Sequence, residues 1–290
     1  MAITMNSLCF ECQLRKKLKL ARSLGSDEQA TVFARRMMQE LLNAPEWMDS
    51  TEFGALAENL LREYYDVGPD RLKEEKDFSN RFAMERREAI HDQVMQMDDP
   101  VYGALQYAVM GNYIDFSALQ GEVSFETLDE MLAKATELNL DKVAYGKFCE
   151  DLQKGTKFLY LTDNAGEIVF DRILAEEIHK KYPHVEIIFC VRGKPAFNDA
   201  LREDAEAVGI PFPVIDNGTA VGGTPIRLLG EEAKRALNEA DVILSKGMGN
   251  VESMYGCGYN VYYAFLVKCD RLIQVFEKEK MTPMFFRERQ

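Results

Sequence analysis

An alternation of short apolar runs with helical patterns, beginning at Lys157, constrains this chain more than any other feature. The runs are rich in β-branched and aromatic residues, as buried strands are. The segments between them, such as 168–181 and 225–240, are long enough for crossover helices. This alternation predicts an α/β fold with a doubly wound, mainly parallel sheet. The predicted strands are residues 158–161, 185–191, 212–215, 241–244 and 272–276.

The first half of the chain has a different pattern, because its apolar residues recur at three- and four-residue steps. This period is typical of amphipathic helices, and Ser26 with Gln29 forms a capping-box pattern before one of them. We therefore predict an all-helical domain over residues 1–154 and an α/β metal-binding domain over residues 155–290. The predicted helices cover about residues 26–41, 53–64, 70–97, 101–111 and 127–138.

Composition limits the partners and the compartment. Asp and Glu number 48 against 35 Lys and Arg, which gives a formal charge of −13. Nucleic-acid binding needs a basic surface, so we expect no nucleic-acid partner. No signal peptide or membrane-length apolar run is visible, and the six cysteines are too few for a disulfide framework. We expect a cytoplasmic protein without a membrane partner; the sequence does not define its oligomeric state.

The loop after the first predicted strand places Asp163, Asn164 and Glu167 directly before a helix. Carboxylate and amide oxygens are the ligands that Mg²⁺ or Mn²⁺ prefers. The opening N–H groups of the helix also favour an anion. Capping of the helix by Asp163 or Asn164 explains the same residues without a ligand.

The loop after the second predicted strand contains Arg192 and Lys194 and ends at Asp199. If the two strands are neighbours, Asp199 faces Asp163 across the sheet edge and completes an oxygen cage. Arg192 or Lys194 would then meet a phosphate. Helix capping by Asp199 and solvation of the two cations are the alternatives.

A third loop follows the strand that ends near residue 244. Lys246 precedes Gly247 and Gly249, which suits contact with an anion through the ammonium group and nearby backbone N–H groups. The order of residues is not that of a P-loop or a dinucleotide fingerprint. Because ligands of doubly wound sheets bind at the carboxyl ends of the strands, the three loops together predict one site.

We interpret two N-terminal features as parts of the structure and not as parts of the site. Cys9 and Cys12 form a C-x-x-C pair, but no second Cys or His pair lies near it in the sequence. Zinc and iron–sulfur sites usually need four ligands. The basic run at residues 15–19 is expected to form an exposed face of the first helix.

These motifs, in this order, resemble those of the damage-control phosphatases, formerly called domain of unknown function 89. The Cys9–Cys12 pair marks one branch of that family. The loop 192–199 departs from the family pattern, since Ala196 and Phe197 replace a more usual aliphatic pair. The matching segments are 163–167, 198–199, 246–250, 79–80 and 112–115.

The resemblance implies a helical N-terminal part on a doubly wound domain that hydrolyses small phosphorylated metabolites with Mn²⁺, Co²⁺, Ni²⁺ or Mg²⁺. It implies that Asp163, Asn164 and Asp199 bind the metal ion. Glu167, Arg192 and Lys246 would be the catalytic residues that line the phosphate pocket. Substrate contacts are assigned to Asn112, Asp115, Gly247 and Asn250.

We therefore predict a divalent-metal-dependent phosphatase. Water is the expected nucleophile, because Ala165 interrupts the Asp-x-Asp pattern of aspartyl-phosphate phosphatases. One alternative is an S-adenosylmethionine-dependent carboxyl methyltransferase, which would bind a nucleoside without metal. Another is a non-catalytic sugar-phosphate or metal-binding module, which would bind its ligand without turnover.

Overall fold

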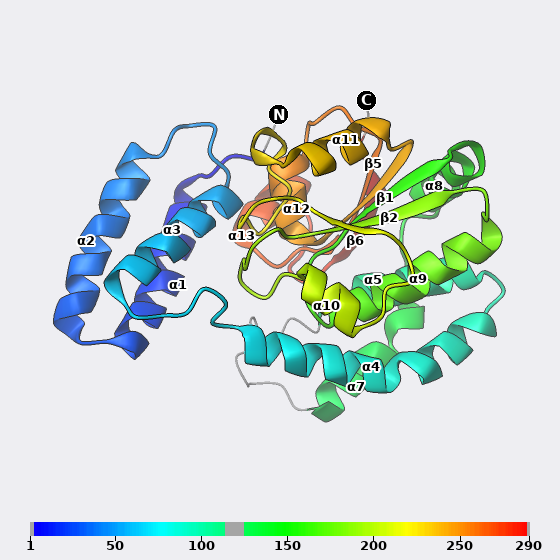
Figure 1. Ribbon diagram of the computed structural model, residues 1–290, viewed down its shortest axis with the longest axis horizontal. Helices are drawn as coiled ribbons and strands as arrows, with labels where there is room; N and C mark the ends of the chain where they lie inside the picture. Colours follow the sequence, from blue (N-terminus) through cyan, green and yellow to red (C-terminus); the bar gives the residue numbers. More distant parts are fainter. Residues whose placement is uncertain (1–2, 114–124, 289–290) are drawn as a thin grey trace.

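The computed structural model describes residues 3–113 and 125–288, and its centre is a six-stranded sheet with helices on both faces (Figure 1). The strand order is β3-β2-β1-β4-β5-β6. Strands β1 to β5 are parallel, and β6 pairs antiparallel with β5. The predicted doubly wound, mainly parallel fold with a helical N-terminal region is confirmed. The strands are β1 (Lys157–Leu161), β2 (Glu186–Val191), β3 (Val214–Asp216), β4 (Val242–Lys246), β5 (Val261–Leu266) and β6 (Pro283–Arg287).

One predicted strand is wrong. Residues 272–276 belong to helix α13 (Asp270–Phe276), and the fifth parallel strand is β5. The Cys269 sulfur caps this helix by accepting a hydrogen bond from the Leu272 N–H at 3.4 Å. An apolar run of five residues is too short for its periodicity to separate helix from strand. All six residues of β5 are buried, as expected for a strand covered on both faces.

Successive side chains of each strand point to opposite faces of the sheet, so the sheet separates two hydrophobic cores. Phe158 and Tyr160 of β1 pack with helices on one face, and Leu159 and Leu161 pack on the other. In the described part of the chain, no helix is long and apolar enough to cross a membrane. The first core includes residues of α4 (Lys73–Met95), α5 (Pro100–Gly111), α7 (Phe125–Ala133), η1 (Ala135–Glu137), α8 (Lys142–Lys154), α9 (Glu167–Lys181) and α10 (Arg202–Ala207). The second includes residues of α11 (Glu231–Glu239), α12 (Gly247–Met254) and α13. The short helix η2 (Ile226–Leu228) precedes α11.

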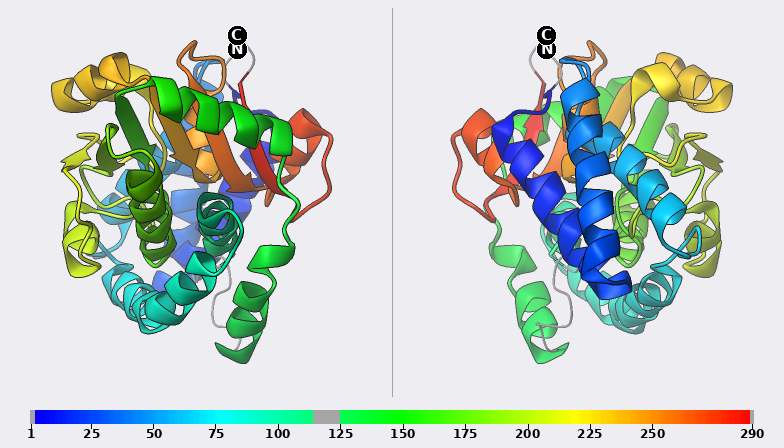
Figure 2. Two further views of the ribbon diagram at one scale, coloured as in Figure 1. Left: turned by 90° about the vertical axis from the view of Figure 1, so that its right-hand side faces the viewer. Right: turned by 90° about the vertical axis from the view of Figure 1, so that its left-hand side faces the viewer.

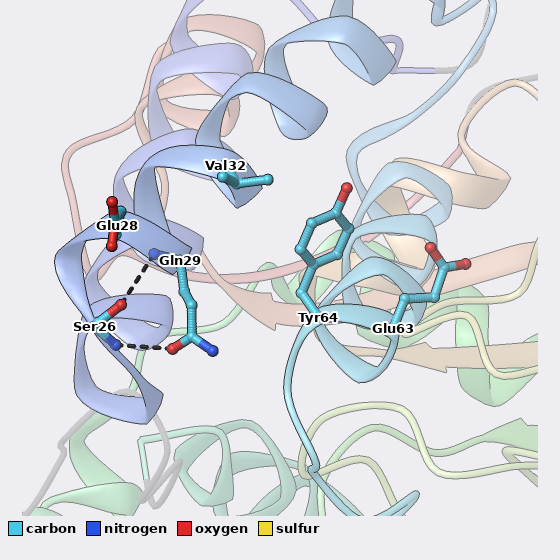
Figure 3. A pocket seen from close by; sticks show the side chains of 6 residues that line it. All are labelled: Ser26, Glu28, Gln29, Val32, Glu63 and Tyr64. Atoms are coloured by element: carbon cyan, nitrogen blue, oxygen red, sulfur yellow. Dashed lines mark hydrogen bonds between the residues drawn. The ribbon is translucent and has the colours of Figure 1, made fainter.

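The first three helices form a separate group with a hydrophobic cluster of their own. They lie at one end of the molecule in Figure 1, and the right-hand view of Figure 2 shows them side by side, facing the viewer. The predicted capping box is confirmed: the Gln29 N–H donates to Ser26 Oγ at 3.2 Å, and the Ser26 N–H donates to Gln29 Oε1 at 3.0 Å (Figure 3). These helices are α1 (Ser7–Leu24), α2 (Asp27–Asn43) and α3 (Ser50–Tyr64).

The prediction of an exposed basic face on α1 is wrong for Lys17. This side chain is buried and pairs with Glu58 of α3. Its ammonium also lies over the ring of Phe197, 4.8 Å from the ring centroid. A lysine in a polar run is normally solvated, but its long apolar stem can be buried when a carboxylate receives the charge.

A buried polar cluster connects α4 to two loops of the α/β region. The Asn80 side chain accepts from the Gly166 N–H at 2.7 Å and donates to Asp204 Oδ1 at 2.8 Å. The other Asp204 oxygen accepts from the Leu201 N–H at 2.8 Å and lies 3.4 Å from the Lys76 ammonium. Helix α4 thus holds the turn after β1 and the segment after β2 in fixed positions.

We predict that Asp204→Ala lowers the free energy of unfolding by about 3–5 kcal/mol, because it leaves buried donors and the Lys76 charge without this partner. Asp204→Asn should cost less, since its amide oxygen still accepts a hydrogen bond. Urea unfolding measures both values. Glu203→Ala is the control, as Glu203 is exposed one residue away. An equal loss in Asp204→Ala and Glu203→Ala would contradict this role of the cluster.

Candidate functional site

The candidate site lies where the strand order reverses. Strand β1 has β2 on one side and β4 on the other, and the chain winds outward in both directions from this pair. Ligand crevices of doubly wound sheets form at such a point, beyond the carboxyl ends of the strands. Asp163 follows β1, and Gly247 follows Lys246 at the end of β4. The loop after β1 and the first residues of α12 (Gly247–Met254), which directly follows β4, therefore meet at the sheet edge.

The loop after β2 joins this edge through backbone pairing. Asn164 and Asp199 form an isolated antiparallel bridge. The Ala165 N–H donates to the Asn198 carbonyl at 2.9 Å, and the Ala200 N–H donates to the Asp163 carbonyl at 2.8 Å. This paired segment, residues 163–165 with 198–200, places the three proposed metal ligands together.

Two amide side chains bridge the carboxylates of Asp163 and Glu167. Asn112 Nδ2 donates to both carboxylates, at 2.9 Å each. Asn164 Nδ2 does the same at 2.7 and 3.0 Å. The Asn112 Oδ1 atom is buried and has no hydrogen-bond partner among the described residues. The end of α5 thus supplies a polar oxygen to the site.

The carboxylate cluster carries more negative charge than its buried surroundings favour. Burial raises the pKa of Asp163 well above its usual value, and the nearby charges of Glu167 and Asp199 raise this pKa further. Arg192 and Lys268 oppose the shift. A bound cation would stabilise the ionised form of such a cluster.

Arg192 contributes a buried guanidinium with one unused donor. Its Nε donates to Asp199 Oδ2 at 2.6 Å, and its Nη2 lies 3.9 Å from Asp163 Oδ1. Nη2 is buried and reaches no hydrogen-bond acceptor within the residues that the structure describes. A fixed guanidinium with a free N–H group is suited to a phosphoryl oxygen.

The Lys246 ammonium points into the protein, toward buried acceptors, and not toward the expected phosphate. Its ammonium is fully buried and donates to Glu167 Oε1 at 2.7 Å, Asp171 Oδ1 at 2.6 Å and the Ala108 carbonyl at 2.8 Å. An ammonium group has three protons, so these acceptors use all of them. Burial alone would lower the pKa of Lys246, but the charges of Asp171 and Glu167 outweigh it and raise this pKa.

Gly247 and Asn250, both expected to contact the substrate, belong to helix α12 and have structural functions there. Gly247 has φ +77, and a Cβ atom there would lie 1.9 Å from Asp163 Oδ2. Only glycine fits this conformation and this approach. The Asn250 amide donates to the carbonyls of Thr162 at 3.0 Å and Lys246 at 2.7 Å, and its oxygen accepts from the Thr224 hydroxyl at 2.8 Å. Asn250 therefore joins the ends of β1 and β4.

Two charged residues of the site were not predicted from the sequence. Asp171 lies one helical turn after Glu167 on the same face of α9, and this four-residue spacing of two carboxylates was the available signal. Lys268 follows β5, the strand that was not predicted, and its ammonium donates to the Asn112 carbonyl. Asp115, assigned above to substrate contact, lies outside the described residues.

The residues present fit a hard divalent cation. Across residues 3–113 and 125–288, no three Cys, His, Asp or Glu side chains are grouped as a metal site. The carboxylates of Asp163 and Asp199 and the amides of Asn112 and Asn164 would supply only part of an oxygen shell. Mg²⁺ and similar ions are usually bound in this way, with water and substrate phosphate completing the shell. Asn112 Oδ1, which has no partner in the described part of the chain, and the excess negative charge agree with such an ion.

Other candidate features lie apart from this site. The Cys9 and Cys12 thiols are free, and both belong to α1. A hollow of about 380 Å³ lies on α2 and α3 (Figure 3), and no candidate site residue lines it.

Comparisons with known proteins agree over nearly the whole chain. Residues 5–282 match the family described as damage-control phosphatase ARMT1-like domain. A Methanocaldococcus jannaschii protein is 31% identical over 280 residues, which cover 90% of this chain and 88% of that protein. A damage-control phosphatase of Archaeoglobus fulgidus is 29% identical, with 92% of this chain and 93% of that protein covered. The crystal structure of a DUF89 family protein, PH1575 from Pyrococcus horikoshii, superposes with a TM-score of 0.85 at 26% identity, covering 98% of this chain and 99% of that one. The chain therefore belongs to the family of damage-control phosphatase ARMT1-like domains.

Proposed function

We propose that this protein is a divalent-metal-dependent phosphatase that hydrolyses phosphate monoesters of small metabolites. The observation that carries the proposal is the buried Nη2 of Arg192, which has no acceptor among the described residues and lies beside the oxygens of Asp163 and Asp199. This arrangement offers a cationic donor to a phosphoryl oxygen next to ligands for a metal ion. Relatives from Archaeoglobus fulgidus and Pyrococcus horikoshii are named damage-control phosphatases, which supports the same reaction.

Asp163, Asn164 and Asp199 would hold the ion. Phosphate monoesters hydrolyse so slowly that enzymes accelerate them by up to about 10²¹-fold. A bound divalent ion supplies Lewis-acid polarisation of the phosphoryl group and activates water. Arg192 Nη2 would donate to a phosphoryl oxygen as that oxygen gains charge in the transition state. The hydrogen bond from Arg192 Nε to Asp199 fixes the guanidinium in place beforehand.

Glu167 and Lys246 support this arrangement without contacting the substrate. Glu167 Oε2 accepts from the amides of Asn112 and Asn164 and so orients both side chains. The Lys246 ammonium pairs with the other Glu167 oxygen, Oε1, and so neutralises the charge of this carboxylate. We therefore assign Lys246 a positioning role in place of the phosphate contact expected from the sequence.

The first prediction of this proposal concerns metal removal. Mn²⁺, Co²⁺, Ni²⁺ or Mg²⁺ should raise the melting temperature and allow phosphate release from sugar phosphates, and a chelator should reverse both effects. A ligand at 100 times its Kd stabilises the native state by about 2.7 kcal/mol. Differential scanning fluorimetry and a phosphate-release assay measure the two effects. Full activity of chelator-treated protein would refute metal dependence. Stabilisation by S-adenosylmethionine alone would favour a methyltransferase, and metal binding without turnover would favour a binding module.

Asp163→Asn and Asp199→Asn should abolish metal binding while the fold stays intact. Asn keeps the size and the hydrogen-bonding oxygen of Asp but lacks its charge. At pH 7 the metal-free Asp163→Asn variant should melt at or above the wild-type temperature. The raised pKa of Asp163 means that its ionised form destabilises the native state. Asp216→Asn, at the end of β3, is the matched control. Wild-type metal affinity in both site variants would place the ion elsewhere.

Arg192→Lys should lower kcat by about 10²- to 10³-fold, as the loss of one preorganised donor does. Lysine keeps the charge but cannot donate to Asp199 and to a phosphoryl oxygen in the same fork geometry. Metal affinity should stay within a few-fold of wild type, and Arg202→Lys, which alters an exposed arginine, should leave kcat unchanged. A kcat near wild type in Arg192→Lys would remove Arg192 from the mechanism.

A further inference from the structure

The loop that carries Asp199 contacts the N-terminal helices through Phe197. This residue has φ +51, a left-handed conformation that is uncommon for an aromatic residue. A Cβ atom added to Gly54 of α3 would lie 3.3 Å from Cζ of the ring, and one added to Gly222 would lie 3.2 Å from Cδ2. The ring is therefore held between α3 and the segment at Gly222, at two positions where the neighbouring residue has no side chain.

The same ring meets a charged cluster that joins α1 to α3. The Lys17 ammonium of α1 lies 4.8 Å from the ring centroid and pairs with Glu58 of α3. Glu58 also accepts from Arg71 at 3.2 Å. A desolvated cation over an aromatic face is attracted to it more strongly than an exposed one. Phe197 thus contacts both helices through one side chain.

Phe197 directly precedes the paired segment of the candidate site. The carbonyl of the next residue, Asn198, accepts from the Ala165 N–H at 2.9 Å. A Cβ atom on Gly222, which the ring contacts, would also lie 3.7 Å from Asp199 Oδ1. A displacement of the ring would be passed to the Asp199 carboxylate within two residues of backbone.

We propose that Phe197 is a positioning residue through which helices α1 and α3 hold Asp199 in its place in the site. This inference rests on the proposed function, because its expected consequence is that a correctly placed Asp199 binds the metal ion more tightly. It gives the N-terminal helices a role in assembling the site in addition to their own packing.

Hydrogen exchange of the metal-free protein tests the positioning itself. In Phe197→Ala, the amides of Ala165 and Ala200 should exchange faster than in wild type, because their hydrogen bonds hold the two loops together. Phe212→Ala is the matched control: Phe212 is also a half-buried aromatic side chain, but it packs on Phe189 and His179. Unchanged exchange in Phe197→Ala, or the same acceleration in Phe212→Ala, would overturn the proposal.

Isothermal titration with Mn²⁺ tests the consequence. Phe197→Ala should bind Mn²⁺ about tenfold more weakly than wild type, the usual scale for an outer-shell change. Phe212→Ala should bind it as wild type does. Wild-type protein that binds no Mn²⁺ would refute the proposed metal site, and hydrogen exchange would still decide the role of Phe197. Wild-type affinity in Phe197→Ala would overturn this inference alone.

A glycine pair separates positioning from stability. Gly54→Ala and Gly146→Ala both replace a glycine inside a helix, which favours the helix. Only the new methyl group at position 54 meets Phe197, since a Cβ on Gly146 has nothing within 4 Å. Gly54→Ala should weaken Mn²⁺ binding and speed exchange at Ala200 without lowering the melting temperature, and Gly146→Ala should change neither. Equal behaviour of the two variants would overturn the proposal.

Discussion

The buried ion pairs of Lys246 with Glu167 and Asp171 are the interaction on which the rest of the site depends. The ammonium reaches from the end of β4 to two carboxylates of α9 and to the Ala108 carbonyl of α5. Removing one partner of a buried ion pair leaves an uncompensated charge, which is strongly destabilising. Strand β4, α5 and α9 are therefore held in one relative position, and the orientation of Glu167 follows from it.

Glu167 connects these ion pairs to the proposed metal site. Its second oxygen accepts from Asn112 and Asn164, and both amides also donate to Asp163. The two buried cations of the site, Lys246 and Arg192, differ in function. Lys246 has all its protons occupied inside the protein, whereas Arg192 retains an N–H group without an acceptor among the described residues. In the proposed function, this difference would let a protein with a formal charge of −13 present a local cationic group to an anionic substrate.

The N-terminal helices differ in how they relate to the sheet. Helices α4, α5 and α8 share a hydrophobic core with the sheet, whereas α1, α2 and α3 bury a cluster of their own. The second group reaches the Asp199 loop through Lys17, Gly54 and Phe197. Because a few specific contacts connect this group to the Asp199 loop, we expect the junction to respond to single substitutions.

The sequence by itself determined the local elements and the order of the site loops. Some patterns depend only on residues that are near one another in the chain: the capping box at Ser26, the helical spacing of the first half and the alternation of strands. These patterns could therefore be recognised in the sequence alone. The position of Asp163, Asp199 and Lys246 at one edge of the sheet followed from the rule that parallel strands end at one edge. Tertiary structure alone decided that β5, not residues 272–276, is the fifth strand, that Lys17 is buried, and that Lys246 faces Glu167 and Asp171. Lys246 meets Ala108 from 138 residues away, and Lys17 meets Glu58 from 41 residues away. Whether a long charged side chain is solvated or buried depends on which remote segment supplies its partner, and no local pattern contains that information.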